Sequence, residues 1–213
     1  MTSLKEHWRR WVKCKESRRR VDELNAAMAI ADNLRDPAFV FPIILPGTLL
    51  SQGWPGPMVG IVDTPFALTW AEIRSQGVWT YVTPATAQLW DDNGVDWRRI
   101  AFQNLRNESS QGYSGEKRDD DDNISFLVML QADAFGPSRL LIPNLFEKQL
   151  GKDYLVALPE QTCAIAYRKF LEKAERDAAN RVIDDCFQKG TEPMSAEHFR
   201  ADVFWQMAIL EDW

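Results

Sequence analysis

The chain contains 213 residues, of which 45% are hydrophobic and 26% are charged, and its formal net charge is -6. This composition excludes a disordered chain of low hydrophobicity and high charge, and the length is sufficient for one sizeable core. No stretch reaches the roughly 18 to 20 apolar residues that cross a bilayer, and the first 20 residues contain no apolar signal segment, so we expect a cytoplasmic protein.

Residues 1–36 are expected to form a basic helical segment. Apolar residues recur three or four positions apart near its start: Leu4, Trp8, Trp11 and Val12. This spacing, with Ser3 and Glu6 as a capping box, predicts a long helix over about residues 3–34. The first 20 residues contain eight Lys or Arg and two Glu, a net +6, which leaves -12 on the rest of the chain.

Residues 39–82 are expected to contain three strands and one helix. The predicted strands are residues 39–45, 58–62 and 78–82. The first suits a sheet edge or an extended segment, because Pro42 cannot donate a ladder hydrogen bond. Residues 69–77 are expected to be a helix, since Thr69 and Glu72 match a capping box and Gly77 matches a helix stop.

Two further helices are expected to begin after Thr83 and Asp96, whose side chains can accept hydrogen bonds from free helix amides. Hydrophobic periodicity then disappears over residues 107–123, which include four consecutive aspartates, and this pattern is typical of a flexible polar and acidic loop. Adjacent aspartates lack the spaced acids, central glycine and closing glutamate of a calcium-binding loop.

The C-terminal half is expected to begin with a strand over residues 124–131. A turn at Gly136-Pro137 then precedes a helix from Ser138 to Gly151, which Pro143 bends or divides. Residues 154–158 and 162–168 match a hairpin. A helix that ends near Gly190 follows, with Phe170 and Phe187 among its inward residues, and a last helix is expected from Ser195 onward.

These elements predict an α+β (mixed α/β) fold. We expect a single domain over residues 1–213, built on one mixed sheet of about four to six strands with helices packed on it. The long N-terminal helix and the C-terminal helices complete this predicted architecture.

Four segments of the chain follow one another in a recognisable order: residues 100–106 (IAFQNLR), 133–143 (DAFGPSRLLIP), 156–159 (VALP) and 193–199 (PMSAEHF). Together they resemble the uncharacterised bacterial YtpQ-like family, whose members share a domain of unknown function, over roughly residues 57–205. In the family, Asn-Arg-Asp tends to follow the proline that corresponds to Pro159. This chain departs from that pattern, because Glu160-Gln161-Thr162 follows Pro159 here. The resemblance implies no established activity, substrate or cofactor.

Catalytic chemistry has few candidate residues. His7 and His198 are the only histidines. Ser138 with His198 lacks the Gly-X-Ser-X-Gly turn of a nucleophilic serine, so a helix cap is the preferred interpretation of Ser138. Cys163 with His198 is a second possible pair, but a cysteine within a strand is usually a small buried hydrophobe. Cys14, Cys163 and Cys186 include no Cys-X-X-Cys pair, so we expect reduced thiols and no zinc site.

Two groups of binding residues remain as candidates. The first group is Trp8, Arg9, Arg10 and Trp11, which can contact nucleic acid, anionic lipid or another protein from the N-terminal helix. Alternatively, the two tryptophans can pack on the core. The second group is Asp133, Ser138 and Arg139, which flank the Gly-Pro turn at a predicted helix start. Free amides at a helix start attract anions, so these residues are candidates for an anion-binding site. An internal ion pair of Asp133 with Arg139 is the preferred interpretation.

The leading functional hypothesis is a non-enzymatic interaction protein. An aromatic-rich chain with uneven charge favours a protein partner, bound through a tryptophan-bearing surface or the N-terminal helix. The alternatives are a hydrolase-like enzyme with an unfamiliar site and nucleic-acid binding through the basic helix. No cofactor and no metal is expected, since the sequence contains no nucleotide-binding glycine motif and no metal-ligand spacing.

Overall fold

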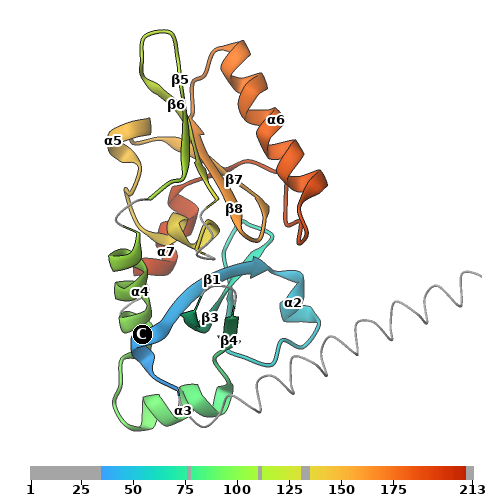
Figure 1. Ribbon diagram of the computed structural model, residues 1–213. Helices are drawn as coiled ribbons and strands as arrows, with labels where there is room; N and C mark the ends of the chain where they lie inside the picture. Colours follow the sequence, from blue (N-terminus) through green and yellow to red (C-terminus); the bar gives the residue numbers. More distant parts are fainter. Residues whose placement is uncertain (1–34, 76–77, 110–111, 131–134, 210–213) are drawn as a thin grey trace, which may run out of the picture.

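The computed structural model describes residues 35–75, 78–109, 112–130 and 135–209. Helices and two antiparallel sheets are both present, so the predicted α+β class is confirmed at that level (Figure 1). The expected long helix, with Trp8, Arg9, Arg10 and Trp11, lies outside the described residues, and so does Asp133. None of the helices in the described ranges has the length and apolar character needed to cross a membrane.

The first sheet is built around one long strand. Its members are β1 (Val40–Pro46), β2 (Met58–Gly60), β3 (Phe66–Ser75) and β4 (Val78–Tyr81). β1 lies along one side of β3, whereas β2 and β4 pair with successive parts of its other side. β1 therefore lies at the edge, as Pro42 predicts, and the short η1 (Pro37–Phe39) and α2 (Thr48–Ser51) flank it.

The helix expected over residues 69–77 is wrong, because β3 runs through most of this segment. Thr69 is 0% exposed and Glu72 is 6% exposed, so the residues that match a capping box lie inside the protein. Both faces of β3 are covered, which gives a nearly continuous apolar strand without the alternation that identifies a half-exposed one. Pairing with three strands outweighs the local capping signal here.

Two helices follow the predicted caps closely. In α3 (Pro84–Asp92) the Thr83 hydroxyl accepts a hydrogen bond from the Thr86 amide, and in α4 (Trp97–Glu108) the Asp96 carboxylate accepts one from the Arg99 amide. α4 crosses β1 and buries its apolar face against the first sheet.

The second sheet has the strand order β5-β6-β8-β7-β9. Its strands are β5 (Gly115–Arg118), β6 (Ile124–Met129), β7 (Tyr154–Glu160), β8 (Cys163–Arg168) and β9 (Phe199–Arg200). The predicted hairpin is confirmed as β7 and β8. The loop expected over residues 107–123 needs correction, since residues 115–118 pair with β6 and Asp119 accepts hydrogen bonds from the Asp121 and Asn123 amides to close the turn.

The remaining helices differ in part from the prediction. Residues 138–151 form η2 (Pro137–Leu141) and α5 (Glu147–Leu150) instead of one helix, since Pro143 and Asn144, with φ 59°, interrupt the backbone between them. α6 (Lys173–Lys189) confirms the long helix and lies along the second sheet (Figure 1). α7 (Asp202–Ile209) starts later than expected.

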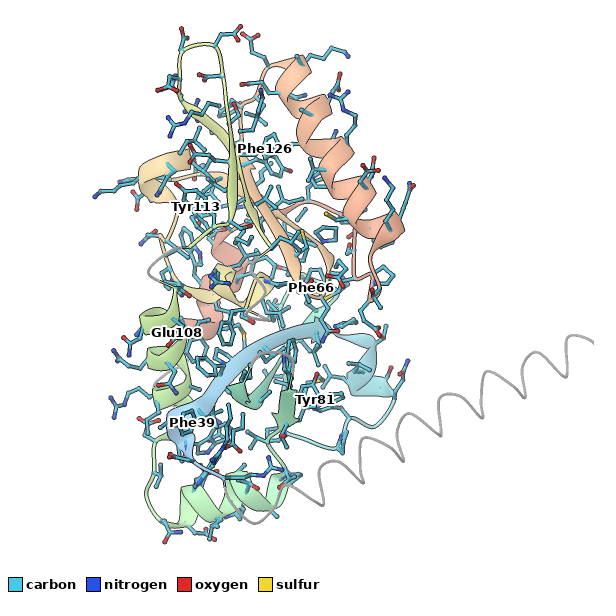
Figure 2. All side chains as sticks on the ribbon, in the orientation of Figure 1. Phe39, Phe66, Tyr81, Glu108, Tyr113 and Phe126 are labelled. Carbon is cyan, nitrogen blue, oxygen red and sulfur yellow. The ribbon has the colours of Figure 1, made fainter. Side chains whose placement is uncertain are left out.

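One cluster of buried residues includes side chains from both sheets. Phe66 of β3 lies 5.3 Å from Phe199 of β9 and 6.2 Å from Phe204 of α7 between ring centroids, and Figure 2 labels Phe66 where the two sheets approach each other. A smaller cluster lies between α6 and the second sheet. The expectation of one mixed sheet is therefore corrected to two antiparallel sheets, because strand patterns in the sequence do not specify which strands pair.

Candidate functional site

Ser138 and Arg139 are placed in the interior. Each is 1% exposed and belongs to η2. Gly136 occupies the N-cap position and no side chain caps this short helix, so the expected capping role of Ser138 is wrong. The Arg139 guanidinium lies 5.9 Å from the centroid of Phe135, within the range of a cation-π contact. Neither side chain is presented to an external ligand in this arrangement.

Gly136 brings three distant segments together. A Cβ atom at this position would lie 2.3 Å from the Thr162 carbonyl oxygen and 2.8 Å from the Met129 carbonyl oxygen. The end of β6, the turn between β7 and β8, and the start of η2 therefore pack backbone against backbone. Only glycine leaves enough space for this contact.

The β7–β8 turn is organised by a buried carboxylate. Glu160 is 8% exposed, and its side chain accepts hydrogen bonds from the Thr162 amide at 2.7 Å, from the Thr162 hydroxyl at 2.6 Å and from the Glu192 amide at 3.4 Å. The backbone of residues 192–195 also bonds to Leu158, Pro159 and Gln161. We call Gly136, Glu160, Gln161, Thr162 and Glu192 the turn cluster.

Tyr81 connects the turn cluster to the first sheet. Burial raises the pKa of Tyr81 to about 12, the side-chain hydrogen bond with Gln161 acts in the opposite direction, and the charge of Glu192 adds to the increase. Its ring also meets Trp54 edge to face at 4.7 Å between centroids. The Tyr81 phenol and the Gln161 amide connect the first sheet to this turn. The only hydroxyl of the turn cluster, that of Thr162, donates to the Glu160 carboxylate, which also accepts two backbone amides and so holds the turn.

His198 has a partner of its own. Its Nδ1 lies 2.5 Å from the Tyr167 hydroxyl oxygen, whereas Cys163 Sγ lies 3.5 Å from Cys186 Sγ. Burial raises the pKa of Tyr167 to about 12. The suggested Cys163–His198 pair is therefore not formed, since each residue has another partner. Within the described ranges, no group of three or more His, Cys, Asp or Glu side chains could hold a metal ion.

The tryptophans of the described residues are internal. Six of them have a described burial, and all are buried or half-buried: Trp54, Trp70, Trp79, Trp90, Trp97 and Trp205. The Trp97 indole donates a hydrogen bond to Asp91 at 2.8 Å, and Arg98 lies 4.2 Å from its ring centroid. None of these six tryptophans is classed as exposed, and the expected binding through a tryptophan-bearing surface stays a prediction.

A different aromatic residue is exposed. Phe170, between β8 and α6, is 84% exposed, although the sequence pattern predicts an inward position. The neighbouring Leu171 is buried, and the Lys169 amino group lies 5.6 Å from the Phe170 ring centroid. Adjacent apolar residues at a helix start both match a core pattern, so the sequence does not show which one turns outward.

Several charged groups lie at the same end of the second sheet as Phe170. Arg168 bonds to Asp119 at 3.3 Å, which ties the end of β8 to the acidic turn between β5 and β6. Asp120, Asp121 and Asp122 are exposed on that turn, and Lys173 is exposed at the start of α6. Figure 1 shows this turn and the start of α6 at the same end of the second sheet.

Comparison with known proteins found no family model, no curated protein and no solved structure that matches the chain.

Proposed function

We propose that the chain acts by binding another protein and that Phe170 is the anchor of the contact. The observation that carries this proposal is the 84% exposure of a large aromatic side chain on an otherwise charged end of the molecule. Aromatic residues are enriched in the buried centres of protein interfaces, whereas charged residues surround such centres. Lys169, whose amino group lies 5.6 Å from the Phe170 ring centroid, and the exposed charged residues at this end of the sheet correspond to such a rim.

The expected energetic contribution of Phe170 is substantial. Burial of an exposed Phe side chain against a partner contributes about 1.5–3 kcal/mol, which corresponds to roughly a ten- to hundredfold change in affinity. The same side chain makes few contacts within the chain, so its removal is expected to change the free energy of unfolding by no more than about 0.5 kcal/mol. Binding and stability can therefore be separated at this residue.

The test compares Phe170→Asp with Leu89→Asp, because Leu89 is an exposed apolar residue on α3, in another part of the fold. Immobilised wild-type and variant chains are exposed to extract from the cell of origin, and retained proteins are quantified. We expect a protein that is retained by wild type and Leu89→Asp but lost from Phe170→Asp, and whose purified form binds Phe170→Asp at least about tenfold more weakly. Equal affinity for all three chains would reject the proposal.

The other functional hypotheses receive less support. A hydrolase that uses Ser138 needs an accessible hydroxyl, but this residue is 1% exposed. Nucleic-acid binding depends on residues 1–20, which lie outside the described residues, and it stays a second proposal. The YtpQ-like relationship and the cytoplasmic location are also proposals, and neither alters the role assigned to Phe170.

A further inference from the structure

Two thiols lie close together between the second sheet and its covering helix. Cys163 is on β8 and is 1% exposed, whereas Cys186 is half-buried near the end of α6. Their sulfur atoms are 3.5 Å apart. A disulfide has a sulfur-sulfur distance of about 2.05 Å, so a displacement of roughly 1.5 Å would join them. The two residues are free thiols in this structure.

The two thiols differ in their access to an external oxidant. Burial raises the pKa of the Cys163 thiol, and the neighbouring Cys186 thiol adds to this increase. Cys163 therefore stays protonated and shielded, whereas Cys186 is the more accessible sulfur. An accessible cysteine that is oxidised first and a nearby cysteine that resolves it are the two components of a reversible thiol pair.

We propose that Cys163 and Cys186 form an oxidative modification site, at which a hydroperoxide converts the two thiols into a disulfide between β8 and α6. The Cys186 sulfur attacks a peroxide oxygen, so that an S–O bond forms and the O–O bond breaks, and the Cys186 proton and the leaving hydroxide form water. The Cys163 sulfur then attacks the Cys186 sulfur, so that the S–S bond forms and the S–O bond breaks, and the Cys163 proton leaves with the hydroxyl group as water. In total, the thiols lose two protons and two electrons, and hydrogen peroxide is reduced to two water molecules.

The position of this pair connects it to the turn cluster. The Cys186 carbonyl accepts a hydrogen bond from the Gly190 amide at 2.9 Å, and a Cβ atom at Gly190 would lie 2.3 Å from Glu160 Cγ. A bond between residues 163 and 186 would therefore fasten the end of α6 beside the β7–β8 turn. The oxidised chain is expected to open less readily at this part of the structure.

The experiment uses the full chain with Cys14→Ser, so that only the proposed pair remains. After treatment with hydrogen peroxide, we expect tryptic peptides 153–168 and 182–189 to be linked under non-reducing conditions and released by dithiothreitol. The midpoint of thermal unfolding is expected to rise by about 6–12 °C, because the disulfide restricts the unfolded chain. Cys186→Ser in the same background is the matched control and should show neither change.

Two results would overturn the inference. One is oxidation of Cys186 to sulfinic acid without any linked peptide, and the other is a disulfide formed only between two chains. Because the first measurement uses a chain in which both thiols are intact, the result does not depend on whether a Cys163 variant folds. Phe170 lies beyond the other end of α6, so this test and the partner-binding test can fail independently.

Discussion

Gly136 lies where β6, η2 and the β7–β8 turn meet, and its surroundings leave no space for a side chain. Two carbonyl oxygens occupy the space that a side chain would need. The resemblance motif places a glycine at this position, but the sequence alone does not show that a turn from another hairpin packs against it. The contact explains why a residue without Cβ is required here.

We predict that Gly136→Ala lowers the free energy of unfolding by about 2–3 kcal/mol, because the added methyl group overlaps backbone atoms that cannot rotate away. Gly115→Ala is the matched control, since a Cβ there meets nothing within 4 Å. Urea unfolding of both variants measures the two changes in the free energy of unfolding. A loss in Gly136→Ala no larger than in Gly115→Ala would show that the turn is not packed as described.

At the scale of elements, Asn104 of α4 explains how the edge strand β1 is held. Its side-chain amide donates hydrogen bonds to the Pro37 carbonyl at 3.1 Å and to the Val40 carbonyl at 3.0 Å. Edge strands leave backbone groups without a strand partner, and such groups need another donor when they are buried. One side chain of a neighbouring helix provides it here.

We predict that Asn104→Asp costs about 1–3 kcal/mol of stability, because a carboxylate accepts hydrogen bonds and would face two carbonyl oxygens that need a donor. The exposed neighbour Gln103 provides the control, and Gln103→Ala should change stability by no more than about 0.5 kcal/mol. Chemical denaturation measures both variants. If Asn104→Asp were as stable as Gln103→Ala, the proposed anchoring of β1 by Asn104 would be contradicted.

The sequence predicts an element correctly where neighbouring residues determine it, and less well where residues distant in the sequence do. The caps at Thr83 and Asp96 and the β7–β8 hairpin follow from neighbouring residues, and the structure confirms them. Thr69 and Glu72 carry the same kind of local signal, but β3 is defined by pairing with strands that are distant in the sequence. The exposure of Phe170 depends on how α6 meets β8, which periodicity alone does not determine.

At the scale of the whole molecule, the buried Tyr154 and Tyr167 and the half-buried Tyr81 link stability to alkaline pH. Burial raises the pKa of Tyr81, Tyr154 and Tyr167 to about 12 from an ordinary value of 10. The folded chain therefore holds these protons at pH values where the unfolded chain has released them. The corresponding stabilisation is complete below pH 10 and is lost as the pH rises towards 12.

We predict a decrease in the free energy of unfolding between roughly pH 9 and pH 11 that is smaller in Tyr81→Phe, which has no proton to lose. Denaturation at both pH values measures the decrease, and the ultraviolet absorbance of tyrosinate reports ionisation in the folded chain. Ionisation of every tyrosine near pH 10 in the folded chain would contradict the raised pKa of these three phenols.

The most direct measurement of the proposed function places a photo-crosslinking phenylalanine analogue at position 170 of the full chain inside the cell of origin, with the same analogue at position 89 for comparison. Phe170 and Leu89 are both exposed, but only Phe170 is proposed to contact a partner. The predicted result is a discrete covalent adduct with one other protein from position 170 and none from position 89. The same adducts from both positions, or none from position 170, would contradict the account.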